Sequence, residues 1–406
     1  MIGRPASPPQ PGGPAEVFVA FLRLGLTSFG GPVAHIGYFH SEFVERRGWL
    51  DAGTYGEYVA MAQFLPGPAS SQVGLAVGAH RAGLVGSLAA WLGFTLPSAI
   101  LMLLLGFGIA RVGDLRDSAA LHGLKLVAVA VVVLALWQMA QQLCPDRRRR
   151  ALALCSAVIV LILPPTLGQI TAMAAGALIG LVALRGGALD NGADDGSAPT
   201  AAPLSPRFAA AALAIFFLLL AALPLFAWLS GDAGLAFVDV FYRAGALVFG
   251  GGHVVLPLLE AGVVPPGWAD KDSFLAGYGA AQALPGPLFT FAGYLGSLPT
   301  APVSGLGGGL LCILAIFMPS FLLVFGILPF WARLRRHGAA QAAVTGTNAA
   351  VVGVLLAALY DPLWIAGVTN AADFAFVIAA LGLLALGRLP PWLVVILGAL
   401  LAPALL

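Results

Sequence analysis

The sequence predicts an all-α, polytopic integral membrane protein: two inverted-topology repeats of about six segments each and an extra connecting transmembrane helix, about thirteen segments in all. Three observations support this class. Of the 406 residues, 60% are hydrophobic and 9% are charged, whereas soluble domains carry about 25% charged residues. Long apolar runs recur through most of the chain, and they lack the alternation of transmembrane strands. Finally, the second half of the chain repeats the first.

The repeat is visible at the level of motifs. RLGLTSFGGPVAH (residues 23–35) recurs as RAGALVFGGGHVV (243–255), 220 positions later. AQFLPGP (62–68) recurs as AQALPGP (281–287), 219 positions later. Further pairs align at offsets of 219 to 223: Trp49 with Trp268, Pro97-Ser98 with Pro319-Ser320, and Gly123 with Gly346. An offset that stays this constant over more than a hundred positions indicates duplication.

A polar, acidic stretch rich in Gly, Ala and Pro divides the halves and reads as an aqueous linker. We therefore expect a flexible tail (1–15), a first repeat (16–184), a polar linker (185–207), a connecting transmembrane helix (208–229) and a second repeat (230–406). The predicted segments are 16–39, 55–80, 83–110, 121–143, 151–164 and 166–184 in the first repeat, and 236–259, 273–297, 303–331, 341–360, 371–387 and 390–405 in the second.

The segment 208–229 has no partner in the first half, and one extra span turns the second repeat upside down. With it, thirteen Lys and Arg residues fall on one side of the membrane and five on the other. Without it, the split is ten to eight. Positive loops face the cytoplasm, so the sequence predicts a cytoplasmic N-terminus and an external C-terminus.

Inverted repeats are typical of transporters, whose sites lie near the midplane where broken helices meet. Each QxxPGP stretch carries such a break: Pro66, Gly67 and Pro68 in the first half, and Pro285, Gly286 and Pro287 in the second. Proline removes a backbone donor and frees a carbonyl one turn earlier. Gln63 and Gln282 precede the breaks, and two roles stay open for them: satisfying the freed carbonyls, or donating to a substrate.

The FGG stretches combine an arginine with adjacent glycines. Gly30 lies two helical turns after Arg23, on nearly the same face, and Arg243 and Gly250 repeat this spacing. In either copy alone, a snorkelling arginine beside small packing residues explains the pattern. Both copies together favour an anion site between the repeats. The candidate substrate-binding residues of these stretches are Arg23, Phe29, Gly30, Gly31, Pro32, Arg243, Gly250, Gly251 and His253.

Three ionisable residues differ between the copies. Glu57 aligns with Ala276, Asp239 with Val19, and His253 with Val33. They are the candidates for proton coupling or gating. An interfacial or ion-paired carboxylate is the simpler interpretation of Glu57 and Asp239.

Other classes of protein are not supported. The net charge of +2 indicates no nucleic-acid partner, and three scattered cysteines indicate no disulfide framework or metal site. The six histidines form no ligand spacing such as HExxH. We expect no cofactor, no metal and no catalytic residues, and a membrane-embedded enzyme is the disfavoured alternative.

The paired stretches RLGLTSFGGPVAHIGYF (23–39) and AQFLPGPASSQVG (62–74), with their copies, resemble the chromate ion transporter (CHR) family, in its long two-domain form. The resemblance implies a bacterial inner (plasma) membrane protein that exports chromate and confers chromate resistance, with sulfate as a related or competing oxyanion. The second half departs from the pattern, since Gly252 replaces Pro32.

The residues agree with this substrate in kind, because arginine, backbone N–H groups and helix N-termini bind tetrahedral dianions. A dianion that leaves a negative interior gains about twice 2.3 kcal/mol per 100 mV, so export can run on the membrane potential or on a proton motive force. The alternative is transport or exchange of sulfate or another small oxyanion in the uptake direction. The lipid bilayer is the other expected partner, and the sequence is compatible with a homodimer.

Overall fold

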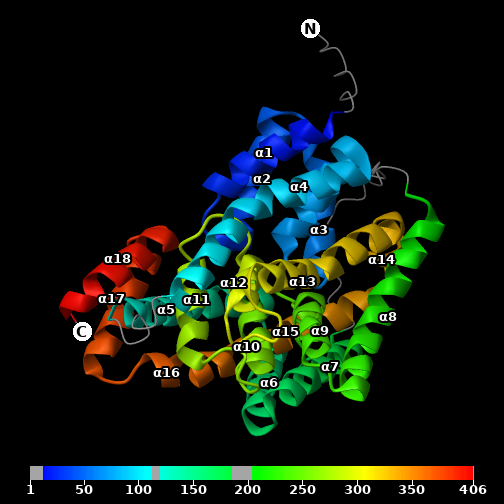
Figure 1. Cartoon of the computed structure of the whole chain (residues 1–406). Coiled ribbons are helices and arrows are strands. Elements are labelled where there is room, and N and C mark those ends of the chain that lie inside the picture. The colour runs from blue at the N-terminus through cyan, green and yellow to red at the C-terminus, as the bar shows by residue number, and fades with distance from the viewer. Residues whose placement is uncertain (1–11, 112–118, 185–203, 406) are drawn as a thin grey trace.

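The computed structural model describes residues 12–111, 119–184 and 204–405, and of residues 109–111 and 166 the backbone alone. Throughout these ranges the regular elements are helices (Figure 1), which confirms the all-α prediction. Most of the predicted tail (1–15) and linker (185–207) lies outside the described residues. So do Arg4, Arg116, Arg185 and the side chain of Arg111.

The helices follow the predicted order. The first half contains α1 (Pro14–Thr27), α2 (Gly31–His40), the π-helix η1 (Ser41–Arg46), α3 (Ala52–Phe64), α4 (Ala69–Arg111), α5 (Ala119–Leu143), α6 (Arg147–Ile162) and α7 (Pro165–Ala183). The predicted connecting helix is α8 (Pro206–Ser230). The second half contains α9 (Ala233–Leu247), η3 (Gly252–Val254), α10 (Val255–Val263), α11 (Lys271–Ala281), η4 (Leu288–Thr290), α12 (Phe291–Ser297), α13 (Gly305–Ile327), η5 (Leu328–Phe330), α14 (Trp331–Leu334), α15 (Gly338–Ala358), η6 (Leu359–Trp364), α16 (Ile365–Gly367), α17 (Ala371–Ala385) and α18 (Pro391–Leu405).

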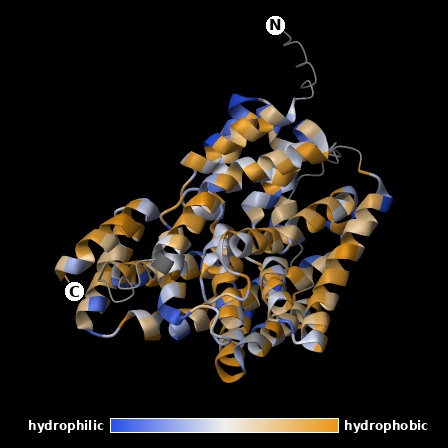
Figure 2. Ribbon diagram, in the orientation of Figure 1, coloured by the Kyte–Doolittle hydropathy of each residue, from blue (hydrophilic) through white to orange (hydrophobic). Residues whose placement is uncertain are grey.

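The chain is a multi-pass membrane protein. Five described helical stretches are long and apolar enough to cross a bilayer: Ala69–Gly108, Ala119–Leu143, Pro206–Ser230, Gly305–Leu334 and Gly338–Gly367. In the most apolar window of α8 only 17% of residues are buried, against at least 56% in the other four stretches. Hydrophobic residues cover α8 in Figure 2, as expected for a helix at the lipid-facing surface.

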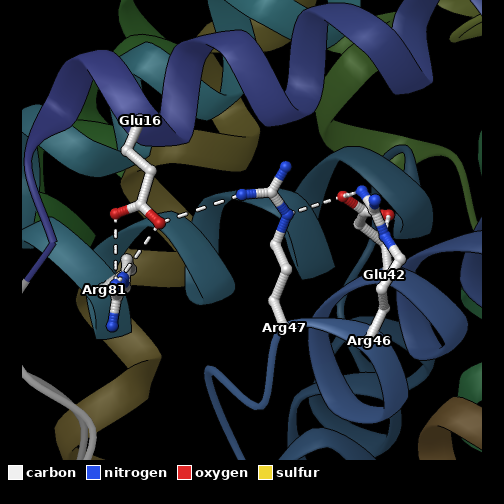
Figure 3. Close-up of polar contacts among 5 residues, drawn as sticks. All are labelled: Glu16, Glu42, Arg46, Arg47 and Arg81. Atoms are coloured by element: carbon white, nitrogen blue, oxygen red, sulfur yellow. Dashed lines mark hydrogen bonds and ion pairs between the residues drawn. The ribbon is translucent and has the colours of Figure 1, made fainter.

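The predicted segment 16–39 does not run straight. α1 ends at Thr27, Gly30 takes a left-handed conformation with φ of 99°, and α2 begins at Gly31. The ends of this segment lie close together, because Glu16 contacts Arg81 at 3.1 Å and Arg47 at 3.8 Å. Figure 3 shows these residues with Glu42 and Arg46. The segment is therefore a helical hairpin that enters and leaves at the same end of the molecule.

The predicted segment 55–80 folds back in the same way at its PGP stretch. The Tyr58 hydroxyl, midway along α3, lies 3.1 Å from Nδ1 of His80, near a kink in α4 at Ala82 and Gly83. The kink separates this short arm from the long stretch of α4 that follows it. The Pro and Gly breaks reverse the chain direction here, where the sequence analysis expected a single segment with an unwound joint.

The second half contains the matching pair of hairpins. The rings of Phe237 and Trp268 lie 5.0 Å apart and join the start of α9 to the turn that follows α10. The Tyr294 hydroxyl donates to the carbonyl of Ser273 at 2.9 Å and joins α12 to α11. Segments 236–259 and 273–297 are thus also hairpins.

The two halves interlock through exchanged helices. α5 of the first half packs against α17 and α18 of the second, whereas α15 of the second half packs against α6 and α7 of the first. Figure 1 shows α5, α17 and α18 together at the left. Gly123 faces the Gly398 backbone, and its aligned partner Gly346 faces the Gly176 backbone, with no room for a Cβ atom at either crossing. Small residues allow this close approach of helices.

Candidate functional site

The hairpin tips of the two halves meet in a reciprocal pair of backbone hydrogen bonds. The Gly67 amide donates to the Val248 carbonyl at 2.7 Å, and the Gly286 amide donates to the Ser28 carbonyl at 2.9 Å. Gly67 aligns with Gly286, and Ser28 aligns with Val248. Each PGP turn is therefore held by the residue just before the FGG stretch of the other half. The broken segments converge at one place between the repeats.

The PGP turns require glycine at this place. Gly67 has a φ of 123° and Gly286 a φ of 92°, a region that side chains disfavour. A Cβ on Gly67 would lie 2.5 Å from Nε2 of Gln72 and 2.9 Å from Oγ of Ser320. A Cβ on Gly286 would lie 3.0 Å from Oγ of Ser98. Both turns thus press against polar side chains at the junction.

The two FGG stretches also meet. A Cβ on Gly252 would lie 3.5 Å from Cγ of Pro32, its aligned counterpart. Positive φ angles occur at Gly30, Gly31, Gly250 and Gly251, with values of 99°, 78°, 75° and 145°. α2 begins directly after this turn, so its first amide groups have no partner within the helix. The Phe29 ring lies 5.6 Å from that of Trp392 in α18, again across the repeats.

The carbonyl of Pro66, within the first PGP turn, accepts a hydrogen bond from a glutamine that was not among the predicted site residues. Nε2 of Gln72, in the first turn of α4, donates to the Pro66 carbonyl at 2.6 Å. Gln72 is fully buried, whereas the side chain of Gln63 is exposed and that of Gln282 is half-buried. Pro68, Pro285 and Pro287 are buried beside the turns.

The two arginines lie apart from the glycine turns. The Arg23 side chain is exposed on α1 and has no ion-pair partner among the described residues. Arg243 pairs with Asp239 at 2.5 Å on α9, where the carboxylate is 4% exposed. In the described part of the chain, neither guanidinium bonds to Gly30, Gly250 or their neighbours.

The other asymmetric residues are also held in place. Glu57 accepts a hydrogen bond from Nε1 of Trp331 at 2.8 Å and forms an ion pair with Arg335, and these contacts join α3 to α14. Nδ1 of His253 lies 2.9 Å from the Tyr278 hydroxyl of α11.

The sequence analysis predicted no role for several buried hydroxyl groups near the junction. Oγ of Ser28, Oγ of Ser320, Oγ of Ser71 and Oγ1 of Thr95 are buried and have no hydrogen-bond partner among the described residues. His35 is also buried, with Nδ1 3.3 Å from Oγ of Ser70. The alignment of Ser98 with Ser320 is the sequence feature that could have indicated hydroxyl groups at this place. The described residues contain no cluster of His, Cys, Asp and Glu that could hold a metal ion.

The family model described as chromate transporter matches this chain twice, over residues 15–181 and over residues 235–402. The chain belongs to the chromate transporter family. Members of this family are transport proteins, which sets aside the membrane-enzyme alternative.

Three curated relatives align with most of this chain. A "Probable chromate transport protein" of Synechococcus elongatus is 28% identical over 361 residues, 84% of this chain and 82% of the relative. A "Chromate transport protein" of Cupriavidus metallidurans is 27% identical over 346 residues, 85% and 81% of the two chains. One of Pseudomonas aeruginosa is 29% identical over 367 residues, 87% and 82%. No solved structure matches this chain.

Proposed function

We propose that this protein exports chromate across the bacterial inner membrane and thereby confers chromate resistance. The reciprocal bonds from Gly67 to Val248 and from Gly286 to Ser28 are the observation that carries the proposal. They join four broken segments from two related halves, which is where inverted-repeat transporters bind their substrates. Three relatives named as chromate transport proteins, one of them as probable, support chromate as the substrate.

The junction suits an oxyanion. α2 and α4 begin beside the glycine turns, and the free amides at a helix N-terminus favour negative charge. Side-chain hydroxyl and amide groups lie next to the same turns. The proposed substrate-binding residues remain Arg23, Phe29, Gly30, Gly31, Pro32, Gln63, Pro66, Gly67, Pro68, Arg243, Gly250, Gly251, His253, Gln282, Pro285, Gly286 and Pro287. In this conformation the glycine turns lie together with the helix ends beside them, whereas Arg23 and Arg243 lie apart from these turns.

The charges support an N-terminus in the cytoplasm and a C-terminus outside. If the four hairpins return to the end at which they enter, twelve described Lys and Arg residues lie at the end that holds Glu16, and two, Lys125 and Lys271, lie at the opposite end. The first set is Arg46, Arg47, Arg81, Arg147 to Arg150, Arg207, Arg333, Arg335, Arg336 and Arg388. Over the same described residues, unbroken segments give a split of eleven to three, so this bias is slightly stronger. The positive end faces the cytoplasm.

The membrane potential supplies a driving force for export. A dianion that moves outward gains about 4.6 kcal/mol per 100 mV. A proton motive force is the other source, with Glu57, Asp239 and His253 as the coupling or gating groups. We propose that α8 faces the lipid, and that the same anion chemistry accepts sulfate as a competitor.

The test is chromate accumulation in cells with and without the protein. We expect cells that contain it to hold less chromate and to grow at higher chromate concentrations, and we expect added sulfate to reduce the difference. Equal accumulation in both strains would refute the export of chromate. Greater accumulation of sulfate in cells with the protein would support the alternative, which is uptake or exchange of another oxyanion.

A further inference from the structure

Two serines occupy equivalent positions at the junction of the repeats. Ser98 of α4 aligns with Ser320 of α13, and each follows a proline inside its helix, Pro97 or Pro319. Ser98 is 1% exposed and Ser320 is 0% exposed. The duplication has thus kept a buried hydroxyl at the same place in both halves.

Each serine faces the PGP glycine of the other half. Oγ of Ser98 lies 3.0 Å from the place of a Cβ on Gly286, and Oγ of Ser320 lies 2.9 Å from the place of a Cβ on Gly67. The hydroxyl groups therefore point at the turns whose amides hold Ser28 and Val248. Each contact between a serine and a glycine turn therefore joins the two repeats.

The hydroxyls have unused hydrogen-bonding capacity. Oγ of Ser320 has no partner among the described residues, and neither have Oγ of Ser28 nor Oγ1 of Thr95. Ser98 donates to the Thr95 carbonyl within its own helix at 3.1 Å, a local bond that a ligand can replace. Buried polar groups are normally satisfied, so unpaired hydroxyls at such a junction indicate a missing partner.

The surroundings select an anion as that partner. α4 begins at Ala69, two residues after Gly67, so its positive N-terminal end lies beside the turn that Ser320 faces. Hydroxyl donors bind an oxyanion without burying a fixed counter-charge, and this leaves the ion free to move on.

We propose that Ser98 and Ser320 are a symmetric pair of hydroxyl donors that bind the transported tetrahedral oxyanion, one beside each PGP turn. This assignment rests on the proposed transport of oxyanions, and it adds two side chains at the junction to the proposed substrate-binding residues. Export then passes the ion between two equivalent half-sites, since each half supplies one serine and one glycine turn.

The test uses the full-length protein in proteoliposomes, with initial rates measured for radiolabelled chromate and, in parallel, for sulfate and molybdate. The variants are Ser98→Ala, Ser320→Ala and the hydroxyl-retaining Ser320→Thr. Ser156→Ala is the matched control, because Oγ of Ser156 is buried and has no partner among the described residues, as for Ser320, but it lies between α6 and α15, against Gly353. The melting temperature of each purified variant reports its folding.

We expect each junction alanine variant to raise the KM about tenfold to a hundredfold, as for the loss of a hydrogen bond to a charged group. The Vmax, melting temperature and Ser156→Ala kinetics should stay near wild type, and Ser320→Thr should restore most of the affinity. A KM within twofold of wild type in both alanine variants would overturn the assignment. Wild-type transport of sulfate but not chromate, with the same serine dependence, would support the assignment and refute only chromate as substrate. Wild-type transport of none of the three ions would refute both.

Discussion

The amide of Gly67 donates to the carbonyl of Val248 at 2.7 Å, although 181 positions separate the two residues. The aligned bond from Gly286 to Ser28 repeats this contact from the opposite half. The two bonds tie each PGP turn to the FGG turn of the other repeat. They also bring the helix ends and buried hydroxyls of both halves to one place, where the proposed oxyanion site lies.

Substituting either turn glycine should abolish transport. Gly67→Ala and Gly286→Ala force a side chain into positive φ, which costs about 1–3 kcal/mol, and the new Cβ would crowd Gln72, Ser320 or Ser98. The measurement is the chromate export rate together with the melting temperature. Gly56→Ala on α3 is the control, because a Cβ there meets nothing within 4 Å. Export near the wild-type rate in both turn variants would contradict the proposed junction.

Removing either arginine should abolish chromate export while the protein level in the membrane stays intact. Arg23→Ala tests the exposed guanidinium of α1. Arg243→Ala also leaves the buried carboxylate of Asp239 without its partner, and this costs about 3–5 kcal/mol when a buried pair is broken. Arg243→Ala combined with Asp239→Ala should restore stability without restoring export. The exposed Arg336→Ala is the control, and normal export by Arg23→Ala or by the double variant would exclude that arginine from transport.

Equivalent loops of the two repeats should face opposite sides of the membrane. Glu45 and Pro265 align, and both are exposed beside the hairpin ends. In a background in which Cys144, Cys155 and Cys312 are replaced by serine, a membrane-impermeant maleimide added to intact cells should label Pro265→Cys and spare Glu45→Cys. Permeabilised cells should show labelling of both. Labelling of Glu45→Cys in intact cells would contradict the cytoplasmic N-terminus.

Acid should remove part of the stability of the first hairpin. Burial raises the pKa of Glu42, but the combined hydrogen bonds and charges of Arg46 and Arg47 outweigh it and hold the pKa below its usual value of 4.5. A carboxyl group whose pKa is lower in the folded than in the unfolded state stabilises the protein at pH values above the unfolded-state pKa. This contribution disappears as the pH falls through the folded-state pKa. We expect Glu42→Gln to destabilise the protein by about 1–3 kcal/mol at pH 7.

The measurement for Glu42 is the melting temperature of wild type and Glu42→Gln from pH 3 to pH 7. The difference between them should shrink below about pH 4.5, the ordinary glutamate value. The exposed Glu45→Gln serves as a control that keeps the same net charge. Because Gln has nearly the same size as Glu, a difference that stays constant down to pH 3 would contradict a stabilising contribution from the charge of Glu42.

The sequence predicted the break at Gly67, because Pro and Gly act locally in the PGP stretch, but it did not predict the break at Gly30, which was expected to lie within one continuous segment. Nor did it predict that the chain reverses at either place. A Pro–Gly break allows either a kink or a hairpin, and the choice depends on contacts between distant residues, such as Glu16 with Arg47 and Tyr58 with His80. The segment 208–229 was predicted correctly as the helix α8, since a long apolar run without internal breaks has few alternatives.

Side-chain roles at the junction were harder to predict than the junction itself. Symmetric spacing drew attention to Gln63, yet Gln72 holds the Pro66 carbonyl, because a side chain in the first turn of α4 can reach back over the turn. The repeated arginines were predicted as site residues, whereas Ser98 and Ser320 were not, although the two serines align. Serine is common in membrane helices, so only its position against the opposite glycine distinguishes this pair.

The most direct test of the account is the flux of radiolabelled chromate into everted membrane vesicles, whose cytoplasmic face points outward. With a potential that is positive inside, vesicles that contain the wild-type protein should accumulate chromate, excess sulfate should compete, and vesicles with Gly286→Ala should match vesicles without the protein. Chromate uptake at the same rate in wild-type vesicles and in vesicles that lack the protein would contradict the account.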